Sequence, residues 1–415
     1  MTDINTPVDG TAPGDEITQR AGWSRRSFMG GLGLVAAGGL LSACAGDDDD
    51  DVASTATSAG SGAPATTGNA DLDEALQASD LPNIEWDMAT SWPLVLETIY
   101  GGAEFFCERV AALTNGRFQI TSAPGGELVP ALEILQNVQT GAVDSGHTAS
   151  YYYVGVDPIC QLSTCVPFGL NARGHLSWLY EGGGHELIEQ IFRDRFGVVP
   201  LPAGNTGCQM GGWFNKEITS VDDLGGLRFR IPGLGGQALA NLGVSVQVIP
   251  GGEIYQSLET GAIDGAEWVG PYDDLQQEFN KVASFYYYPG WWEPGPSLDV
   301  MFPVDKFDAL PEEYQEVLRS AASHSYSWML AKYDALNPPA LQTILDGGGV
   351  TLQEFPNDVM VAARDAVNEI LDANAAADDG YNEVLTSYRD FASGLSAWYG
   401  LAEKSMLDFN ASNGQ

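Results

Sequence analysis

The chain has 415 residues and a formal net charge of −38, because 56 Asp and Glu residues stand against only 18 Lys and Arg residues. This balance argues against nucleic acid as a partner, since binding to phosphates needs a basic surface. With 44% hydrophobic and 10% aromatic residues, the chain is too apolar to be disordered. We therefore expect a folded, strongly acidic protein of roughly two to three domains, with a charge that hints at a saline habitat.

The N-terminal segment 1–43 resembles a twin-arginine export signal followed by a lipoprotein box. The motif SRRSFM at 24–29 precedes a Gly-, Ala- and Leu-rich stretch that ends in LSAC at 41–44. Its apolar run is short for a membrane span and normal for a signal peptide, although a poor transmembrane anchor is the alternative. The resemblance implies export and a lipid on Cys44. Residues 44–80, acidic and then rich in Ala, Ser, Thr and Gly, predict a solvated tether to a folded module at 81–415.

Four cysteines remain in the folded module, Cys107, Cys160, Cys165 and Cys208. An exported compartment permits disulfides, and Cys160 and Cys165 could close a small loop. Four buried free thiols are the alternative. A metal cluster is not expected, because no Cys-x-x-Cys spacing occurs.

From residue 84 the chain alternates strand-like and helix-like patterns, which predicts an α/β architecture. We expect strands at 84–90, 118–122, 143–148, 198–202, 227–231 and 244–249. We expect helices at 94–113, 131–140, 235–242, 253–259, 312–345, 358–375 and 382–408. The latter half is therefore mostly helical.

One internal repeat organises this alternation. PGGEL at 124–128 leads to QTGAVD at 139–144, and PGGEI at 250–254 leads to ETGAID at 259–264. Each copy predicts a loop, a helix, a Gly stop and a strand, so two lobes of related build are expected. Ligands of such sheets gather beyond the carboxyl ends of the strands, in a cleft between lobes.

Common enzyme signatures are absent from the sequence. No GxSxG, HExxH or phosphate-binding loop occurs, and no nucleophile or proton relay can be named. GLGGQA at 233–238 fits a dinucleotide pattern, but the strand before it carries two cations and ends in Pro, unlike the apolar strand of that fold. We therefore expect a binding protein rather than an enzyme.

A few polar residues stand out as candidate ligand contacts. Arg230, at a strand end beside Pro and Gly, is well placed to present its planar fork to a carboxylate, although pairing with a surface acid is the alternative. Gln209 follows a Gly-rich connection where the chain could cross between lobes. Glu267 and Glu293 lie among aromatic, Gly and Pro residues, where ionised carboxylates need a cation. Such oxygen ligands suit Na⁺ or Ca²⁺, and rim carboxylates on packing segments are the alternative.

At these residues the sequence resembles the solute-binding proteins of tripartite ATP-independent periplasmic (TRAP) transporters, the DctP-type family, and within it the branch that binds 2-oxo acids such as pyruvate. The resemblance runs from about residue 86 to 345 and is weaker in the terminal helices. It is carried by MATSWP at 88–93, GHTASYY at 146–152, AGNTG at 203–207, WFNKE at 213–217, RIPGLGG at 230–236, EWVGPY at 267–272, and YYPGW at 287–291 followed by EPG at 293–295.

The resemblance implies a two-lobed periplasmic-binding-protein-like fold with a cleft, crossing strands and long C-terminal helices. The first lobe is expected at about 84–207 plus 285–345, the second at about 208–284, and the terminal helices at 346–415. The family delivers its ligand to one small and one large membrane subunit. A Ca²⁺-lactate-type or other hydroxycarboxylate binder of the same family is the alternative, and a ligand-sensing lipoprotein is a more distant one.

The resemblance also implies roles for single residues. Arg230 matches the clamp for the ligand carboxylate, and Gln209 matches the residue that touches both ligand and cation. Glu267 and Glu293 match the carboxylate ligands of the cation.

Two aromatic residues complete the set that the resemblance implies. Trp268 supplies a backbone carbonyl to the cation and a ring wall to the ligand, and Tyr153, or else Tyr152, meets the ligand. The Gln at position 209 is more similar to the Na⁺-containing members than to the Ca²⁺ members, so Na⁺ is expected and Ca²⁺ is the alternative.

Residues 388–409 place apolar side chains at near-helical spacing. This face either packs against its own lobe or pairs two copies of the chain, as some relatives do by exchanging a C-terminal helix.

Overall fold

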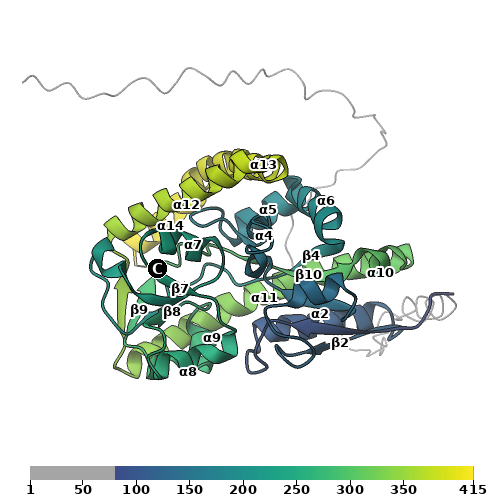
Figure 1. The fold of residues 1–415 in the computed structure, drawn as a ribbon, viewed down its shortest axis with the longest axis horizontal. Helices are drawn as coiled ribbons and strands as arrows, with labels where there is room; N and C mark the ends of the chain where they lie inside the picture. Colours follow the sequence, from purple (N-terminus) through teal and green to yellow (C-terminus); the bar gives the residue numbers. More distant parts are fainter. Residues whose placement is uncertain (1–79, 415) are drawn as a thin grey trace, which may run out of the picture. The chain divides into compact units, whose positions relative to one another are not determined.

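The computed structural model describes residues 80–414 and builds them around two β-sheets (Figure 1). The expected signal peptide at 1–43, the lipid site at Cys44 and the tether lie outside the described residues, apart from Asp80. No helix among residues 80–414 combines the length and apolar character that crossing a bilayer requires.

The first sheet has five strands in the order β2-β1-β3-β10-β4. β1 pairs in parallel with both β2 and β3, whereas β10 runs antiparallel to β3 and β4. The strands are β1 (Ile84–Thr90), β2 (Phe118–Ala123), β3 (Ser145–Thr148), β4 (Val198–Asn205) and β10 (Ser297–Pro303). Every residue of β4 and β10 is buried, as expected for neighbouring strands covered on both faces.

The second sheet has six strands in the order β11-β9-β5-β8-β6-β7. β6 pairs in parallel with β7 and β8, and β5 joins them antiparallel to both β8 and β9. The strands are β5 (Trp213–Phe214), β6 (Arg228–Arg230), β7 (Ser245–Gln247), β8 (Gly265–Ala266), β9 (Phe285–Tyr288) and β11 (Thr351–Glu354). We refer to each sheet with the helices packed on it as the first and the second lobe.

Helices cover both sheets. Those of the first lobe are α2 (Ile99–Leu113), α3 (Ile134–Gln139), α4 (Cys160–Thr164), α5 (Ala172–Glu181), α6 (Gly184–Phe196) and α10 (Val304–Asp308). Those of the second lobe are α7 (Gly233–Asn241), α8 (Ile254–Glu259), α9 (Pro271–Gln276) and α12 (Asn357–Ala377). Short 3-10 helices are η1 (Ser150–Tyr153), η2 (Val221–Leu224), η3 (Gly251–Glu253) and η4 (Phe279–Lys281).

Two helical segments connect the lobes. The 35-residue helix α11 (Glu312–Asp346) packs on β4 and α2 of the first lobe and on α9 of the second. Its close approach to β4 needs a glycine, since a Cβ on Gly204 would lie 2.6 Å from Cε of Met329. Near the C-terminus, α12 packs on α7, and α13 (Asp379–Leu401) packs back on α5 and α6, before α14 (Glu403–Ser412) ends the fold. Figure 1 shows α12 and α13 running across one edge of both lobes.

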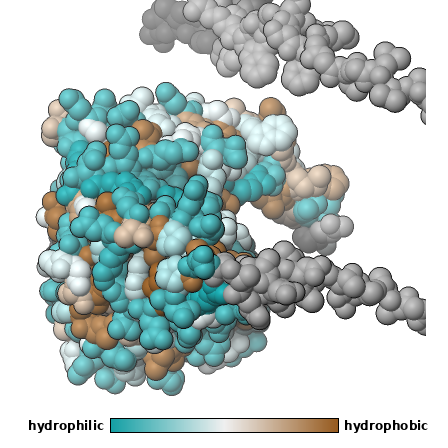
Figure 2. All heavy atoms as spheres, turned by 90° about the vertical axis from the view of Figure 1, so that its right-hand side faces the viewer, coloured by the Kyte–Doolittle hydropathy of each residue, from teal (hydrophilic) through white to brown (hydrophobic). Residues whose placement is uncertain are grey.

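The surface agrees with the acidic composition. The face drawn in Figure 2 carries mostly hydrophilic side chains, with apolar ones in small separate groups. The helix α14 differs, since none of its residues is buried and Met406, Leu407 and Phe409 are each at least 60% exposed. The C-terminal apolar face therefore does not pack fully against its own lobe.

The structure corrects several expectations. Phe285–Tyr288 belongs to the second sheet, because β9 pairs with β5 and β11, so the chain returns to the first sheet only at Ser297. The strand expected at 143–148 is confined to Ser145–Thr148, and the N–H of Tyr152 then donates to the Ala149 carbonyl in a 3-10 turn. The expected helix at 382–408 is two helices, α13 and α14.

The cysteines form no disulfide among themselves. Cys107, Cys160, Cys165 and Cys208 are all free, which rules out the small loop closed by Cys160 and Cys165. Three of these thiols are buried as expected, but Cys208 is exposed.

Candidate functional site

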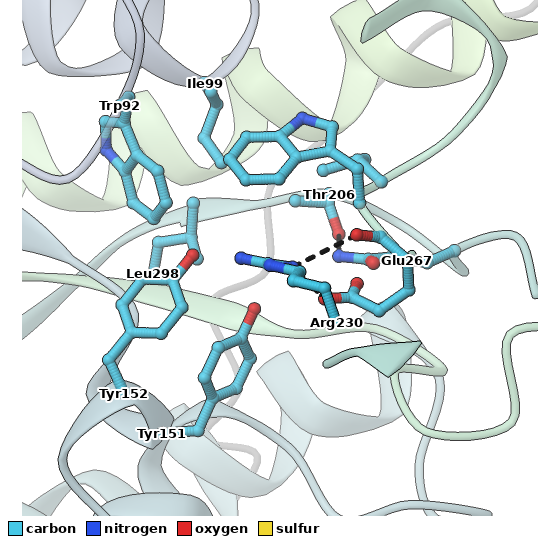
Figure 3. A pocket seen from close by; sticks show the side chains of 11 residues that line it. Trp92, Ile99, Tyr151, Tyr152, Thr206, Arg230, Glu267 and Leu298 are labelled. Atoms are coloured by element: carbon cyan, nitrogen blue, oxygen red, sulfur yellow. Dashed lines mark hydrogen bonds and ion pairs between the residues drawn. The ribbon is translucent and has the colours of Figure 1, made fainter. Parts of the chain in front are cut away.

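A cavity of about 260 Å³, a volume that includes its open side, lies between the two lobes (Figure 3). Only about 10 Å³ of this space is open to the centre of a water-sized sphere, so the side chains enclose it tightly and only a small molecule could bind there. Its first-lobe wall is Trp92, Ile99, Tyr151, Tyr152 and Leu298, its second-lobe wall is Arg230, Glu267, Trp268 and Val269, and the segment that leaves β4 adds Thr206 and Gln209.

Arg230 ends β6, and its side chain reaches into this cavity with only 1% exposure. Nε donates to the carbonyl of Ile249 at 3.1 Å, and Nη1 donates to the backbone carbonyl of Glu267 at 3.1 Å and forms an ion pair with the Glu267 carboxylate. The guanidinium also lies over the Trp268 ring, 5.4 Å from its centroid. Nη2 is buried without a hydrogen-bond partner. The guanidinium is thus fixed along one edge, and its other edge points toward Tyr152 across the cavity (Figure 3).

Two buried carboxyl groups accompany this arginine. Glu267 follows β8, and Glu293 follows β9, with exposures of 1% and 3%. Burial raises the pKa of Glu267, and the positive charge of Arg230 opposes this shift. Burial likewise raises the pKa of Glu293 well above its usual range, and the neighbouring Glu267 adds to the shift. Both groups therefore need a further positive charge to remain ionised together.

The side chain of Gln209 adds an amide to the wall of the same cavity. Its Nε2 donates to Thr206 Oγ1 at 3.0 Å, and its backbone N–H donates to the Glu293 carbonyl at 3.1 Å. The side-chain oxygen Oε1 is then left buried and unpartnered, as are Oε2 of Glu267 and Oε2 of Glu293. Unsatisfied buried oxygens are uncommon in folded proteins and call for an explanation.

These oxygens fit a hard cation. Carboxylate and amide oxygens are the ligands that Na⁺ and Ca²⁺ take, so the unpartnered oxygens are of the type that such a cation would use. Among residues 80–414 no group of three or more His, Cys, Asp or Glu side chains is arranged to hold a metal, so the amide and backbone oxygens would have to complete this set.

Four of the six predicted site residues line the cavity, namely Arg230, Gln209, Glu267 and Trp268. Glu293 is buried near them but is not part of the lining. Tyr153 does not line the cavity either, because its hydroxyl turns away and pairs with Thr148 Oγ1 at 2.8 Å.

The alternative tyrosine, Tyr152, lines the cavity instead, together with Tyr151. The 3-10 turn, rather than a strand, decides which rings face inward.

The apolar part of the wall was missed from the sequence. Trp92, Ile99 and Leu298 were given no role, although Trp92 stands in the MATSWP segment directly after β1. Its place beyond the carboxyl end of a parallel strand is the signal that could have identified it. Leu298 could not have been found in this way, because β10 was not predicted.

The segment 233–238, which fits a dinucleotide-binding pattern, contacts the first lobe. It opens α7, and Oε1 of Gln161 from the first lobe accepts the N–H of Leu234 at 2.6 Å. The helix N-terminus is therefore occupied by a side chain of the opposite lobe.

Comparison with known proteins identifies the family. Residues 88–378 match the DctP family model, described as bacterial extracellular solute-binding protein, family 7. The chain belongs to this family. A monocarboxylate 2-oxoacid-binding periplasmic protein of Nostoc sp. is 51% identical over 333 residues, which cover 80% of this chain and 91% of that protein.

Two solved structures of TRAP transporter solute-binding proteins resemble the chain closely. One from Bordetella bronchiseptica, a dimer with calcium and picolinate, is 40% identical with a TM-score of 0.78 and covers 80% of this chain and 98% of its own. One from Pseudoalteromonas atlantica, with sodium and pyruvate, is 36% identical with a TM-score of 0.76 and covers 79% of this chain and 99% of its own.

These likenesses confirm the expected family and its two-lobed fold. The chain is thus a TRAP solute-binding protein, and the prediction of a binding protein rather than an enzyme is also confirmed, because the family consists of solute receptors.

Proposed function

We propose that this TRAP solute-binding protein captures a small 2-oxo acid, such as pyruvate, together with a metal cation and delivers it to one small and one large membrane subunit. One observation carries the proposal: the donor Nη2 of Arg230 and the oxygens of Gln209 and Glu267 are buried in the cavity wall without partners. Oε2 of Glu293 is also buried and unpartnered, and its carboxyl group interacts with the charge of Glu267. A carboxylate would satisfy the donor, and a cation would satisfy the oxygens.

The ligand class follows from charge and size. Arg230 is the sole cationic residue among those that line the cavity, so one carboxylate can be paired there but not two. The remaining wall is largely aromatic and aliphatic, and the cavity is small. The keto oxygen of a 2-oxo acid, beside the carboxylate, could share the cation that Gln209 and the two glutamates hold. The pyruvate in the Pseudoalteromonas atlantica structure and the name of the Nostoc relative support this class.

Calorimetric titration of the folded module at 81–415 tests which ligand binds. We expect pyruvate and 2-oxobutyrate to bind, and succinate to bind more weakly because its second carboxylate would lack a partner. Tighter binding of succinate than of pyruvate would contradict the proposal. The protein should first be unfolded and refolded to remove any ligand carried through purification.

We propose that Gln209, Glu267, Glu293 and the backbone carbonyl of Trp268 hold the cation, with Na⁺ as the first candidate and Ca²⁺ as the second. The solved relatives support either ion. When bound, the cation supplies positive charge that offsets the repulsion between the two carboxylates and the anionic ligand. These four residues would hold the cation close to the guanidinium of Arg230.

Titration in chelator-treated, Na⁺-free buffer, held at high ionic strength with choline chloride, tests the cation. We expect pyruvate affinity to fall in this buffer and to return when Na⁺ or Ca²⁺ is added. The double variant Glu267→Gln, Glu293→Gln should bind with little dependence on either ion, whereas Asp273→Asn, a buried acid that does not line the cavity, should keep the dependence of the parent. Unchanged parental affinity without cations would mean that the oxygens pair with protein donors.

A Ca²⁺-dependent hydroxycarboxylate is the second candidate for the ligand. The calcium in the Bordetella bronchiseptica relative supports the ion but not this ligand, because that relative holds picolinate. Lactate and pyruvate titrated under each ion in turn separate the two, since the first proposal expects pyruvate to bind more tightly with Na⁺.

We further propose that the exported chain is anchored to the membrane through a lipid on Cys44, which follows the LSAC motif. Fractionation of cells that produce the parent and Cys44→Ala tests this. The parent should remain with membranes and the variant should be released. Recovery of both in the same fraction would contradict the anchor.

A further inference from the structure

The apolar wall of the cavity stands opposite the cation oxygens. Figure 3 shows Trp92 and Leu298 beyond the tip of the Arg230 guanidinium, on the side away from Glu267. Trp92 has 1% exposure and Leu298 has 2%, so both are closed off from solvent. A 2-oxo acid whose carboxylate meets Arg230 and whose keto oxygen meets the cation would extend its carbon chain toward this apolar side.

Trp92 is held in place by one specific hydrogen bond. Its indole Nε1 donates to Nδ1 of His147 at 2.6 Å, and the two rings meet edge to face with centroids 5.8 Å apart. Its backbone is also fixed, because the carbonyl of Trp92 accepts the N–H of Gly125 at 2.8 Å. The ring therefore cannot swing away from the cavity without leaving a buried donor unpaired.

His147 is a rigid partner for the indole. It lies on β3, where Thr90 of β1 and Val300 of β10 are its register partners on the two sides. Because Nδ1 accepts the hydrogen bond from the indole N–H, the proton of the neutral imidazole is on Nε2. Full burial lowers the pKa of His147 to about 3, so the acceptor persists at physiological pH. His147 does not line the cavity itself.

We propose that Trp92 limits the length of the ligand's carbon chain and that His147 is a positioning residue that fixes the indole against that chain. The inference rests on the proposed function, because it assumes that a 2-oxo acid occupies the cavity with its carbon chain toward Trp92. Selectivity among 2-oxo acids is then set by a hydrogen bond outside the cavity, between two residues that the first sheet brings together.

The test is the ratio of dissociation constants for pyruvate and 2-oxovalerate, measured by calorimetry on four single variants and one double variant of the folded module at 81–415. Trp92→Phe removes the pyrrole ring and the donor. His147→Leu removes the acceptor, and His147→Asn keeps an oxygen acceptor close to the position of Nδ1. Trp178→Phe is the matched control, because Trp178 is also fully buried and donates its indole N–H to Ser387, but does not line the cavity.

We expect Trp92→Phe to shift the ratio toward 2-oxovalerate by roughly tenfold or more, since one methylene in an apolar pocket changes selectivity by about 10- to 200-fold. His147→Leu should shift the ratio in the same direction, whereas His147→Asn and Trp178→Phe should keep it within about threefold of the parent. In a Trp92→Phe background, His147→Leu should have no further effect on the ratio, because phenylalanine has no N–H to donate.

The outcomes separate this inference from the function on which it rests. A parent that binds none of the 2-oxo acids refutes the proposed function. A parent that binds pyruvate while Trp92→Phe weakens both ligands equally overturns the length limit. An equal effect of His147→Leu on the ratio with and without the indole overturns the positioning role. If Trp92→Phe fails to fold, the comparison of His147→Leu with His147→Asn still decides that role.

Discussion

Replacement of Arg230 by Lys probes the geometry of the fork at constant charge. The guanidinium is held by the carbonyl of Ile249 and by Glu267, which leaves Nη2 free for a ligand. A lysine ammonium can keep the ion pair with Glu267, but it cannot also reach the Ile249 carbonyl and the ligand from fixed directions. The variant therefore keeps the positive charge but loses the fixed directions of the guanidinium N–H donors.

The magnitude follows from the hydrogen bonds that a lysine cannot make. One charge-assisted hydrogen bond to the ligand contributes about 1.5–3 kcal/mol, and imperfect pairing of the buried ligand carboxylate costs about 1 kcal/mol more. We therefore expect Arg230→Lys to weaken pyruvate binding by roughly 2.5–4 kcal/mol, which is about 70- to 900-fold in the dissociation constant. The fold should persist, because the buried carboxylate of Glu267 keeps a cationic partner.

Calorimetric titration with pyruvate at fixed Na⁺ measures this weakening. Arg228→Lys is the matched control, because Arg228 lies two residues earlier on β6 with its side chain 43% exposed and paired to Asp264 at 2.7 Å. The control should bind like the parent. If Arg230→Lys binds within threefold of the parent while its thermal unfolding is normal, Arg230 is not the carboxylate clamp.

Three further predictions concern closure, pH and assembly. Gln161→Leu removes the acceptor that the first lobe offers to the Leu234 N–H, so we expect it to weaken the closed state by about 1–3 kcal/mol and to lower pyruvate affinity accordingly; unchanged affinity in calorimetry would show that this contact does not contribute to closure. Burial raises the pKa of Asp299 to about 6, above its value of about 3.9 in the unfolded chain, so this group contributes stability that is fully present below pH 4 and is lost as the pH rises through 6. Thermal unfolding of Asp299→Asn should therefore show a smaller gain in stability than the parent between pH 8 and pH 5, by about 1.4 kcal/mol, and an identical gain would contradict the assignment. Finally, the exposed apolar side chains of α14 predict a homodimer through the C-terminal helix. Light scattering should give twice the mass of the chain and Met406→Glu should reduce it, whereas a parental monomer at tens of micromolar would rule the dimer out.

The residues that carry charge at the site could be predicted from the sequence. Arg230 stood out because cations are scarce in this chain, and Glu267 and Glu293 stood out because carboxylates are rare among aromatic, Gly and Pro residues. Chemistry of this kind depends on residue type and immediate neighbours, which a sequence displays directly. The repeated PGGE and TGA segments likewise predicted two lobes of related build.

The tertiary structure decided which residues face one another. Tyr152, rather than Tyr153, lines the cavity, because backbone hydrogen bonds close a 3-10 turn there and this turn sets the direction of each ring. Likewise β9 joins the second sheet, because pairing with β5 and β11 depends on segments about 70 residues away on either side along the chain. The indole of Trp92 and the imidazole of His147 are 55 positions apart in sequence, and only parallel pairing of β1 with β3 brings them within 2.6 Å. Local composition thus determined which chemical groups this protein uses, whereas long-range strand pairing determined their partners and the shape of the site.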